Sequence, residues 1–299
     1  MIHGIINVYK EKGFTSHDVV AKLRGIVGQK KIGHTGTLDP DATGVLPVCL
    51  GKATKLCDLL TDKNKTYEAV LLLGKTTDTQ DITGEVLEEK STEALTEEKV
   101  REAIEGCIGD YEQIPPMYSA LKVNGKKLYE LAREGKVIER KARPVKILDI
   151  QILEIDLPKV RMEVSCSKGT YIRTLCHDIG EKLGCGGCME SLIRTRVSTF
   201  RIEDAKMLDE IETLKQEGKL AELLVPIDAM FPSYPKITVK DDWKAFAKNG
   251  NPLDLKMLKE ACGQDEETQV RLYDESGKFI AIYQWKEKKY HIVKMFFNE

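Results

Sequence analysis

Residues 33–46 read GHTGTLDPDATGVL, and this stretch holds the most informative pattern in the chain. Asp39 stands directly before Pro40, which disfavours a helical backbone at the aspartate. The three glycines of the stretch allow sharp bends or a close approach to a ligand. We therefore expect a loop that presents Asp39 beside the apolar Leu38. The alternative is an aspartate that only hydrogen-bonds its own turn.

Regular elements are predicted on both sides of this loop. Ile5–Val8 has the character of a short apolar strand, and Thr15 or Ser16 can begin a helix that extends to about Val27. Residues 28–52 show little periodicity and are predicted to be long irregular backbone, which in a compact domain is usually functional. The following segments are predicted as a short helix and a strand, respectively: Ala53–Leu60 and Tyr67–Leu73.

A second polar cluster, Ser167–Arg173, follows a predicted strand. Thr170 can cap a helix that extends to Leu183. Tyr171 and Arg173 would then lie at the start of the helix, where both side chains can contact the same ligand. Arg173 can equally pair with a carboxylate and keep it ionised, and a purely structural salt bridge is the alternative.

Charge is unevenly distributed in a chain of formal net charge −2, so no global basic excess indicates a nucleic-acid partner. Residues 78–112 carry 12 acids and 3 bases and are predicted to be solvated helix and loop. Residues 122–146 carry 9 bases and 3 acids, with Tyr118 and Tyr129 on either side of the first part. This pattern suits phosphate contacts and base stacking, and a solvated surface is the alternative.

The 8 cysteines occur in a chain whose start, Met1–Val8, lacks the cationic region of an export signal. We therefore expect reduced thiols and a cytoplasmic protein. The longest apolar stretches, such as Ala69–Leu73, are too short to cross a bilayer. Cys185 and Cys188 have zinc-knuckle spacing without a second such pair, so we expect no metal. A metal site would need nearby ligands, for which the candidates are Cys166, Cys176 and His177.

The C-terminal part is predicted to be a small β-rich module. Residues 226–235 contain three prolines and are the candidate linker. A short helix is expected over Lys240–Lys248. The strands expected after it are Val270–Tyr273, Phe279–Tyr283 and Tyr290–Met295.

The longer stretch GHTGTLDPDATGVLPVCLGKATK, residues 33–55, resembles the catalytic segment of the tRNA pseudouridine-55 synthases of the TruB family. Other stretches resemble the motifs of this family in the same order, namely residues 10–16, 65–67, 114–122, 125–129, 167–174 and 192–200. The sequence departs from the family pattern at Glu11, where proline is usual, at Ile193, where arginine is common, and at Ser198, where glycine is common.

The resemblance implies an α+β fold. A pseudouridine-synthase domain with a mixed, largely antiparallel central sheet would span residues 1–232, with an RNA-gripping insertion at about 113–146. A small β-rich PUA-like module would span residues 233–299 and bind RNA. The implied reaction converts uridine 55 in the T loop of tRNA to pseudouridine without a cofactor or a metal. The implied partner is the T stem-loop, and neither a membrane nor an obligate protein partner is expected.

The resemblance also implies roles for individual residues. Asp39 would be the catalytic aspartate, and Arg173 would pair with it. Tyr67 would stack on the target uracil, although an aromatic residue of the core is the alternative for a tyrosine inside a strand. His34 would fill the space that the extruded base leaves. The pocket would be lined by Tyr171 and Leu192.

The RNA backbone would be contacted by two sets of cations. Lys10 and Lys55 are implied by the family motifs. In the basic insertion, the candidates are Lys126, Lys127, Arg140 and Lys141.

Three other functions compete with this interpretation. A relative that works inside a guide-RNA complex would share the chemistry, and activity on naked tRNA would distinguish it. A non-catalytic tRNA-binding or folding factor would not need Asp39, Tyr67 and Arg173 together. A metal-dependent nuclease or deaminase would need acidic or His/Cys ligand sets that the sequence lacks.

Overall fold

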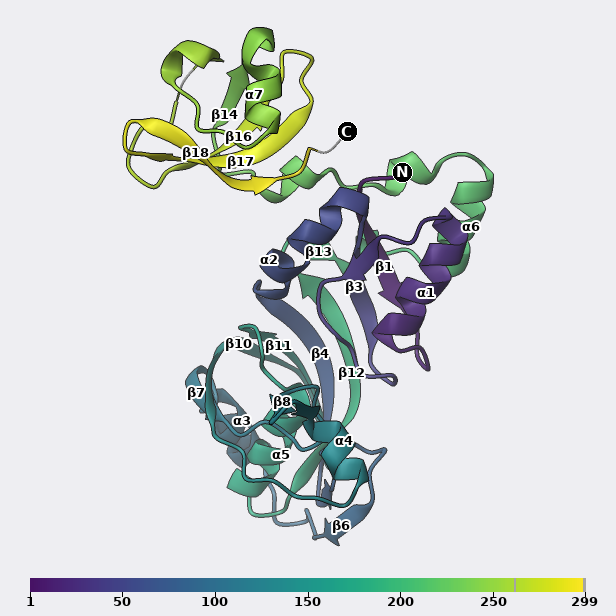
Figure 1. The fold of residues 1–299 in the computed structure, drawn as a ribbon. Helices are drawn as coiled ribbons and strands as arrows, with labels where there is room; N and C mark the ends of the chain where they lie inside the picture. Colours follow the sequence, from purple (N-terminus) through teal and green to yellow (C-terminus); the bar gives the residue numbers. More distant parts are fainter. Residues whose placement is uncertain (261, 298–299) are drawn as a thin grey trace.

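The computed structural model describes residues 1–260 and 262–297, and two larger β-sheets dominate it (Figure 1). The strands of the first sheet all lie between Gly4 and Arg201. Its main path, in spatial order, is β1 (Gly4–Lys10), β3 (Thr43–Leu50), β12 (Gly187–Val197), β4 (Lys65–Leu73), β11 (Lys159–Cys166), β10 (Arg143–Asp156) and β7 (Gly109–Gln113).

Neighbouring strands on this path are antiparallel except for β3 and β12, which are parallel. The expected mixed, largely antiparallel central sheet is therefore confirmed. Two short strands complete the sheet, since β2 (Ile32–His34) pairs with β3 and β13 (Phe200–Arg201) pairs with β12. Two separate hairpins are formed by β5 (Lys75–Thr77) with β6 (Val86–Glu89) and by β8 (Lys122–Val123) with β9 (Lys126–Lys127).

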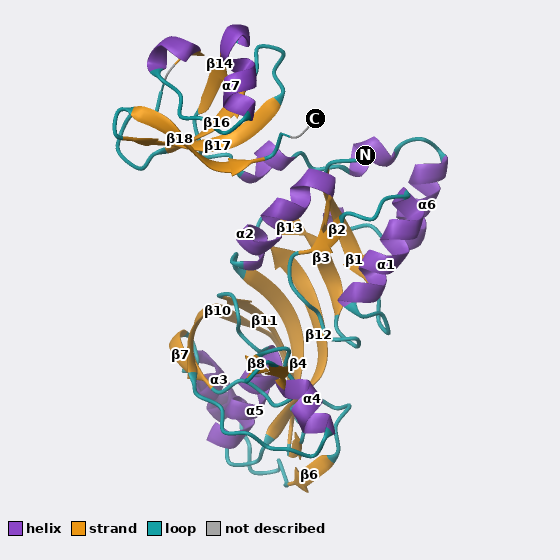
Figure 2. Ribbon diagram, viewed as in Figure 1, coloured by secondary structure: helices purple, strands orange, loops and turns teal. Residues whose placement is uncertain are grey.

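Helices cover the two ends of the sheet separately (Figures 1 and 2). At one end, α1 (Ser16–Val27) and α6 (Leu208–Gln216) share a hydrophobic core with β1, β2 and β3. At the other end, α3 (Glu97–Glu105) and α5 (Ile172–Lys182) pack with β4, β10, β11 and β12. The insertion contributes the short α4 (Leu128–Arg133). Strand β12 joins the two ends of the sheet, because it pairs with β3 on one side and with β4 on the other.

Helix α1 forms as the sequence predicts. Thr15 is the N-cap, and its side chain and that of Asp18 form a reciprocal capping box. Val19, Leu23 and the other buried residues lie on one face of the helix and pack on the sheet. Gly28 ends the helix in the left-handed conformation.

The prediction of irregular backbone throughout residues 28–52 is wrong. The segment contains β2 and the whole of β3, and only residues 35–42 between them form the loop. Strand β3 is buried on both faces, so it lacks the polar alternation that marks a half-buried strand. It also contains Pro47, a residue that argues against a strand.

Sequence patterns also missed β10 and β12 and misplaced the start of α5. Thr170 does not cap this helix, since the N-cap position is occupied by Tyr171, and the Thr170 hydroxyl donates a hydrogen bond to the carbonyl of Ser167 at 3.0 Å. The helix begins at Ile172 instead. Gln113 exchanges two hydrogen bonds with the backbone of Tyr171, at 2.8 and 3.0 Å, and thereby fixes the chain just before the helix.

The second sheet belongs to the C-terminal module. Its strand order is β15 (Leu258–Glu260), β14 (Lys236–Val239), β16 (Gln269–Tyr273), β17 (Phe279–Lys286) and β18 (Lys289–Met295), and the helix α7 (Lys244–Lys248) packs with it. The expected strands after residue 269 are present, whereas β14 and β15 were not predicted. The candidate linker contains a short 3₁₀ helix, Ile227–Met230.

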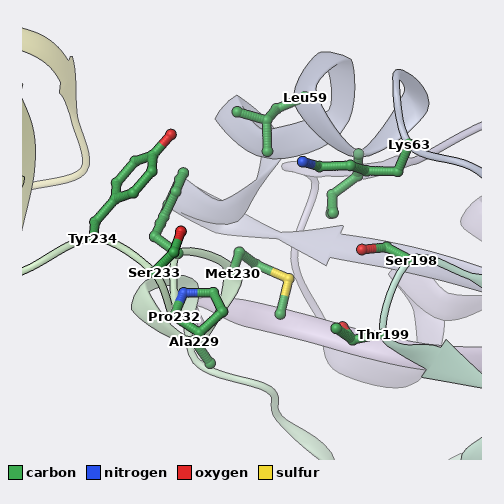
Figure 3. A pocket seen from close by; sticks show the side chains of 11 residues that line it. Leu59, Lys63, Ser198, Thr199, Ala229, Met230, Pro232, Ser233 and Tyr234 are labelled. Carbon is green, nitrogen blue, oxygen red and sulfur yellow. The ribbon is translucent and has the colours of Figure 1, made fainter. Parts of the chain in front are cut away.

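The module also packs against the first sheet. Ile282 and Phe296 are buried in one cluster with Ile5 and Val45, and the ammonium of Lys55 donates to the carbonyl of Met295 at 2.7 Å. Beside this junction, a cavity of about 230 Å³ opens between α2 (Cys57–Thr61), the β12–β13 turn and the linker. Figure 3 shows Lys63, Ser198 and Tyr234 around it. None of the predicted site residues lines this cavity.

The parallel contact of β3 with β12 depends on Gly44. Its φ is +101°, and a Cβ at this position would lie 2.3 Å from the carbonyl oxygen of Arg194. We predict that Gly44→Ala lowers the free energy of unfolding by about 2–5 kcal/mol, from backbone strain plus overpacking. The measurement is the midpoint of urea denaturation. The matched control is Gly25→Ala in α1, where a Cβ meets no atom within 4 Å. A wild-type midpoint for Gly44→Ala would contradict the close approach.

Candidate active site

The loop of Asp39 connects β2 to β3 and is anchored by its own apolar residues. Leu38 and Ala42 are buried in the same core cluster as Tyr67 of β4. The amide of Ala42 donates to the carbonyl of Asp39 at 3.1 Å, which closes a turn around Pro40. The loop therefore rests on the sheet and presents the carboxylate of Asp39 next to β4 and β12.

Lys10 holds the other side of this turn. It is fully buried, and its ammonium donates to the carbonyls of Glu11, Pro40 and Ala42 at 3.2, 3.0 and 2.5 Å. Burial lowers the pKa of Lys10 to about 8, although Asp39 and Asp41 oppose this change. An RNA phosphate, which is the partner expected for Lys10, would therefore have to compete with these three carbonyls.

Arg194 of β12 is a second buried cation that binds the loop. It is 1% exposed, and its guanidinium donates to the carbonyls of Val45, Gly36 and Thr37 at 2.7, 3.3 and 3.5 Å. Its positive charge also lowers the pKa of Tyr67, against the larger opposite effect of burial. Arg194 was not among the predicted site residues, although it lies within the family-like stretch of residues 192–200.

Arg173 brings three groups together at the start of α5. Its guanidinium contacts the carboxylate of Asp39 at 3.0 Å and that of Asp81 at 3.6 Å, and it donates to the carbonyl of Tyr118 at 3.0 Å. The predicted ion pair between Arg173 and Asp39 is thus present. Because Tyr118 belongs to the insertion, this one side chain connects the insertion to the loop of Asp39.

Asp81 was missed because it lies in the acidic stretch that was predicted to be solvated. Its side chain is only 14% exposed. One carboxylate oxygen accepts hydrogen bonds from the Thr79 hydroxyl, the Thr83 hydroxyl and the Thr83 amide at 2.8, 2.6 and 3.0 Å. The other oxygen faces Arg173. Composition alone gave no signal for this exception.

The pKa of Asp39 is raised above its ordinary value. The largest cause is loss of water around the carboxylate, and the negative charge of Asp81 acts in the same direction. The positive charges of Arg173 and Lys10 oppose the rise. The side chain nevertheless keeps 43% of its area accessible. Asp39 is therefore a reachable carboxylate in a surrounding that favours its neutral form, and the cations counteract that preference.

The remaining pocket candidates lie close to this centre. Tyr67 is 8% exposed, and Leu192 is half-buried and packs against the same cluster. Burial raises the pKa of Tyr67. Tyr171 is half-buried, and the charges of Arg173 and Asp39 both act on its hydroxyl. The structure thus brings Asp39, Tyr67, Arg173, Tyr171 and Leu192 together.

His34 and Lys55 are less closely tied to Asp39. The imidazole of His34 accepts a hydrogen bond from the Gly36 amide at 3.3 Å and packs edge-on against the ring of His17, with 5.3 Å between the centroids. Burial lowers the pKa of His34, which favours the neutral ring. Lys55 is half-buried and spans the junction to the C-terminal module through Met295.

Most of the basic side chains proposed for the insertion have internal partners. Lys126 pairs with Glu134 at 3.4 Å, Lys127 lies near the ring of Tyr129, and Arg140 donates to the carbonyl of Pro115 at 3.2 Å. Lys141 is exposed. RNA phosphates would therefore have to compete with these partners at three of the four positions.

Two further findings concern metals and membranes. Cys185 and Cys188 are both buried. Within residues 1–260 and 262–297, no cluster of three or more His, Cys, Asp or Glu side chains is arranged to hold a metal ion. In the same part of the chain, each helix is too short or too polar to cross a bilayer.

Comparison with known proteins identifies the family. The model of the N-terminal domain of TruB family pseudouridylate synthases matches residues 24–172, and that of the C-terminal domain of tRNA pseudouridylate synthase B matches residues 173–232. The chain belongs to the TruB family. The tRNA pseudouridine synthase B of Lachnoclostridium phytofermentans is 58% identical over 307 aligned residues, which cover 99% of this chain and 100% of that relative. The protein of the same name from Bacillus pumilus is 44% identical, with 98% and 96% covered.

Solved structures agree with this TruB assignment. A chain in an H/ACA ribonucleoprotein bound to a substrate RNA containing 2′-deoxyuridine superimposes with a TM-score of 0.73 at 26% identity, covering 99% of this chain and 85% of that chain. A chain of a Cbf5–Nop10–Gar1 complex gives 0.72 at 28% identity, with 98% and 85% covered. The predicted pseudouridine-synthase fold is therefore confirmed.

The buried lysine gives a test of how the loop is held. Lys10→Met would leave the carbonyls of Pro40 and Ala42 without this donor, so we predict a loss of about 1–3 kcal/mol in the free energy of unfolding. Amide hydrogen exchange should also become faster at Ala42. The matched control is Lys12→Met, because Lys12 is 73% exposed and lies 3.9 Å from Asp41. Equal stability of the two variants would mean that Lys10 does not support the loop.

Proposed function

We propose that this TruB family protein converts uridine 55 in the T loop of tRNA to pseudouridine, with Asp39 as the catalytic carboxylate. The observation that carries this proposal is the Arg173–Asp39 ion pair on a loop buttressed by buried cations. The family membership supports the reaction class, and the names of the full-length relatives support tRNA as the substrate. The same names support the cytoplasm as its compartment.

The chemistry needs one carboxylate and a dry pocket. Pseudouridylation breaks the C1′–N1 bond, turns the uracil and joins C1′ to C5. The detached base is itself the next nucleophile, so the second carboxylate that a glycosidase uses to handle water is not needed. Asp39 would act as a nucleophile or stabilise positive charge on the sugar. Attack at C1′, attack at C6 and removal of the 2′-proton all fit one carboxylate.

The base must leave its stack before it can react. Extrusion from an RNA loop costs a few kcal/mol, and stacking on Tyr67 would return roughly 1–3 kcal/mol. Since Tyr67 is 8% exposed, RNA entry must first uncover its ring. The neutral His34 would fill the vacated space. The proton on C5 would leave last, through the Tyr67 hydroxyl or a water molecule.

Activity on naked tRNA separates the proposal from its rivals. The purified protein is incubated with unmodified tRNA, and pseudouridine is mapped along the RNA. We expect one modified position in the T loop. No pseudouridine under conditions in which tRNA binds would favour a non-catalytic binding factor or a protein that needs a guide-RNA complex.

Asp39→Asn tests the assigned carboxylate. The amide keeps the shape of the side chain but removes the charge, so we predict no single-turnover product while tRNA affinity changes by less than about tenfold, or 1.4 kcal/mol. The control is Asp41→Asn, since Asp41 is exposed on the same loop. Measurable product from Asp39→Asn would refute the assignment.

Because the pKa of Asp39 depends on Arg173, we predict that replacing Arg173 changes the pH dependence of the single-turnover rate. The positive charge of Arg173 lowers the pKa of Asp39, so Arg173→Gln should raise it further. If the ionised carboxylate reacts, the rate falls as pH drops through this pKa. We therefore expect the acid limb of the single-turnover rate to move to higher pH in Arg173→Gln. Asp178→Asn is the control, because Asp178 pairs with Tyr111 instead. An unmoved acid limb would contradict the coupling.

The basic side chains of the insertion lead to a prediction about how RNA binding depends on salt. Replacing Lys126, Lys127, Arg140 and Lys141 by alanine should weaken binding and flatten the slope of log K against log salt. Each lost phosphate contact changes this slope by roughly 0.7–0.9. The control replaces Lys90 and Lys99, which lie in the acidic stretch. If the fourfold variant and the wild-type protein have the same slope, the insertion is a solvated surface that makes no phosphate contacts.

A further inference from the structure

Two cysteines lie near each other beside β2, the strand that leads into the loop of Asp39. Cys49 lies in β3 and is fully buried, and Cys57 is the first residue of α2 and is half-buried. The 3₁₀ turn Gly51–Leu56 reverses the chain between them. Cys57 packs against the hydrophobic cluster that contains Cys49.

The position of Gly33 shows that the Cys57 sulfur lies next to Cys49. Gly33 of β2 and Cys49 of β3 are direct partners in an antiparallel pair. The Cβ positions of such partners lie on the same face, about 4.5–5.5 Å apart. A Cβ built on Gly33 would lie 3.2 Å from the sulfur of Cys57. The Cys57 sulfur therefore occupies the space that the missing side chain of Gly33 leaves beside Cys49.

The two thiols also interact with each other. The neighbouring thiol lowers the pKa of Cys57 and raises that of Cys49. The ammonium of Lys294 lowers the pKa of Cys57 further, whereas burial and Asp58 oppose the change. Cys107 and Cys262 are also half-buried, but burial raises the pKa of both. Cys57 thus differs from them in its partner thiol.

We propose that Cys57 and Cys49 form an oxidation site for hydroperoxides, at which Cys57 reacts first and Cys49 converts the product to a disulfide. This arrangement matches the general requirement for a redox-sensitive cysteine, which is an accessible thiol of low pKa beside a resolving thiol. The proposal does not depend on the reaction at Asp39. In a reducing compartment such a disulfide would be transient.

The chemistry balances with hydrogen peroxide as the oxidant. The Cys57 thiolate attacks one peroxide oxygen, the O–O bond breaks, and the leaving hydroxide takes a proton to become water. Cys57 is then a sulfenic acid. The Cys49 sulfur attacks the Cys57 sulfur, the S–O bond breaks, and the departing oxygen leaves as a second water with the Cys49 proton. Two thiols are oxidised to one disulfide, and one peroxide is reduced to two waters.

The experiment uses the full-length reduced protein and hydrogen peroxide. Free thiols are alkylated after the reaction, and the protein is digested with trypsin. Lys52 and Lys55 lie between the two cysteines, so digestion separates them unless a disulfide holds the peptides together. We expect a linked pair that contains Cys49 and Cys57 and that disappears on reduction. Oxidation of Cys107 or Cys262 before Cys57 would overturn the proposal.

Variants separate the two roles. In Cys49→Ser, dimedone should trap a sulfenic acid at Cys57, because the resolving thiol is missing. In Cys57→Ser, Cys49 should stay reduced. Cys262→Ser is the matched control and should still form the linked peptides. If Cys49→Ser fails to fold, the test uses the wild-type protein alone. Sulfinic acid at Cys57 without any disulfide would then show that Cys49 does not react with the sulfenic acid of Cys57.

Discussion

Buried cations hold the loop of Asp39 in place, and the rest of the site depends on this interaction. An irregular loop on top of a sheet has backbone carbonyls that no strand ladder satisfies. Lys10 binds those of Glu11, Pro40 and Ala42, and Arg194 binds those of Val45 and the preceding turn. A cation serves several converging carbonyls at once. Its burial is costly, so both side chains need all of these partners.

One of these cations, Lys10, also acts on the charge state of Asp39. Loss of water favours neutral Asp39, and Asp81 adds to this effect. Arg173 and Lys10 act in the opposite direction. Support of the loop and the pKa of Asp39 are therefore coupled, because Lys10 both binds the loop carbonyls and lowers this pKa. The insertion joins this network through the Tyr118 carbonyl on Arg173, so RNA that moves the insertion would also act on the ion pair.

The C-terminal module is bound more closely than a proline-rich linker suggests. Phe296 and Ile282 fill a cluster with residues of β1 and β3, and Lys55 reaches the Met295 carbonyl. Removal of the module would expose this apolar surface. The polar and basic side chains that the sequence assigned to RNA are, in part, already engaged within the protein, as Lys10 and Arg140 show.

Much of the fold and the centre of the site could be predicted from local patterns. The α1 helix, the β4 strand and the exposed Asp39 loop follow from capping residues, alternation and the Asp-Pro pair. Asp39 and Arg173 could be paired only through the family resemblance, because 134 positions separate them in the sequence. Asp81 could not be found, since an acid in an acidic stretch carries no local sign of burial.

The sequence by itself determined the capped helix α1, the strand β4 and the loop that presents Asp39, because these depend on neighbours along the chain. Only the tertiary structure decided which cations bind backbone carbonyls, as Lys10 and Arg140 do. It also placed β3 as a doubly buried strand, brought Arg194 against Gly44, and set the Cys57 sulfur in the space beside Gly33. These outcomes depend on contacts between distant segments, and no local pattern records them.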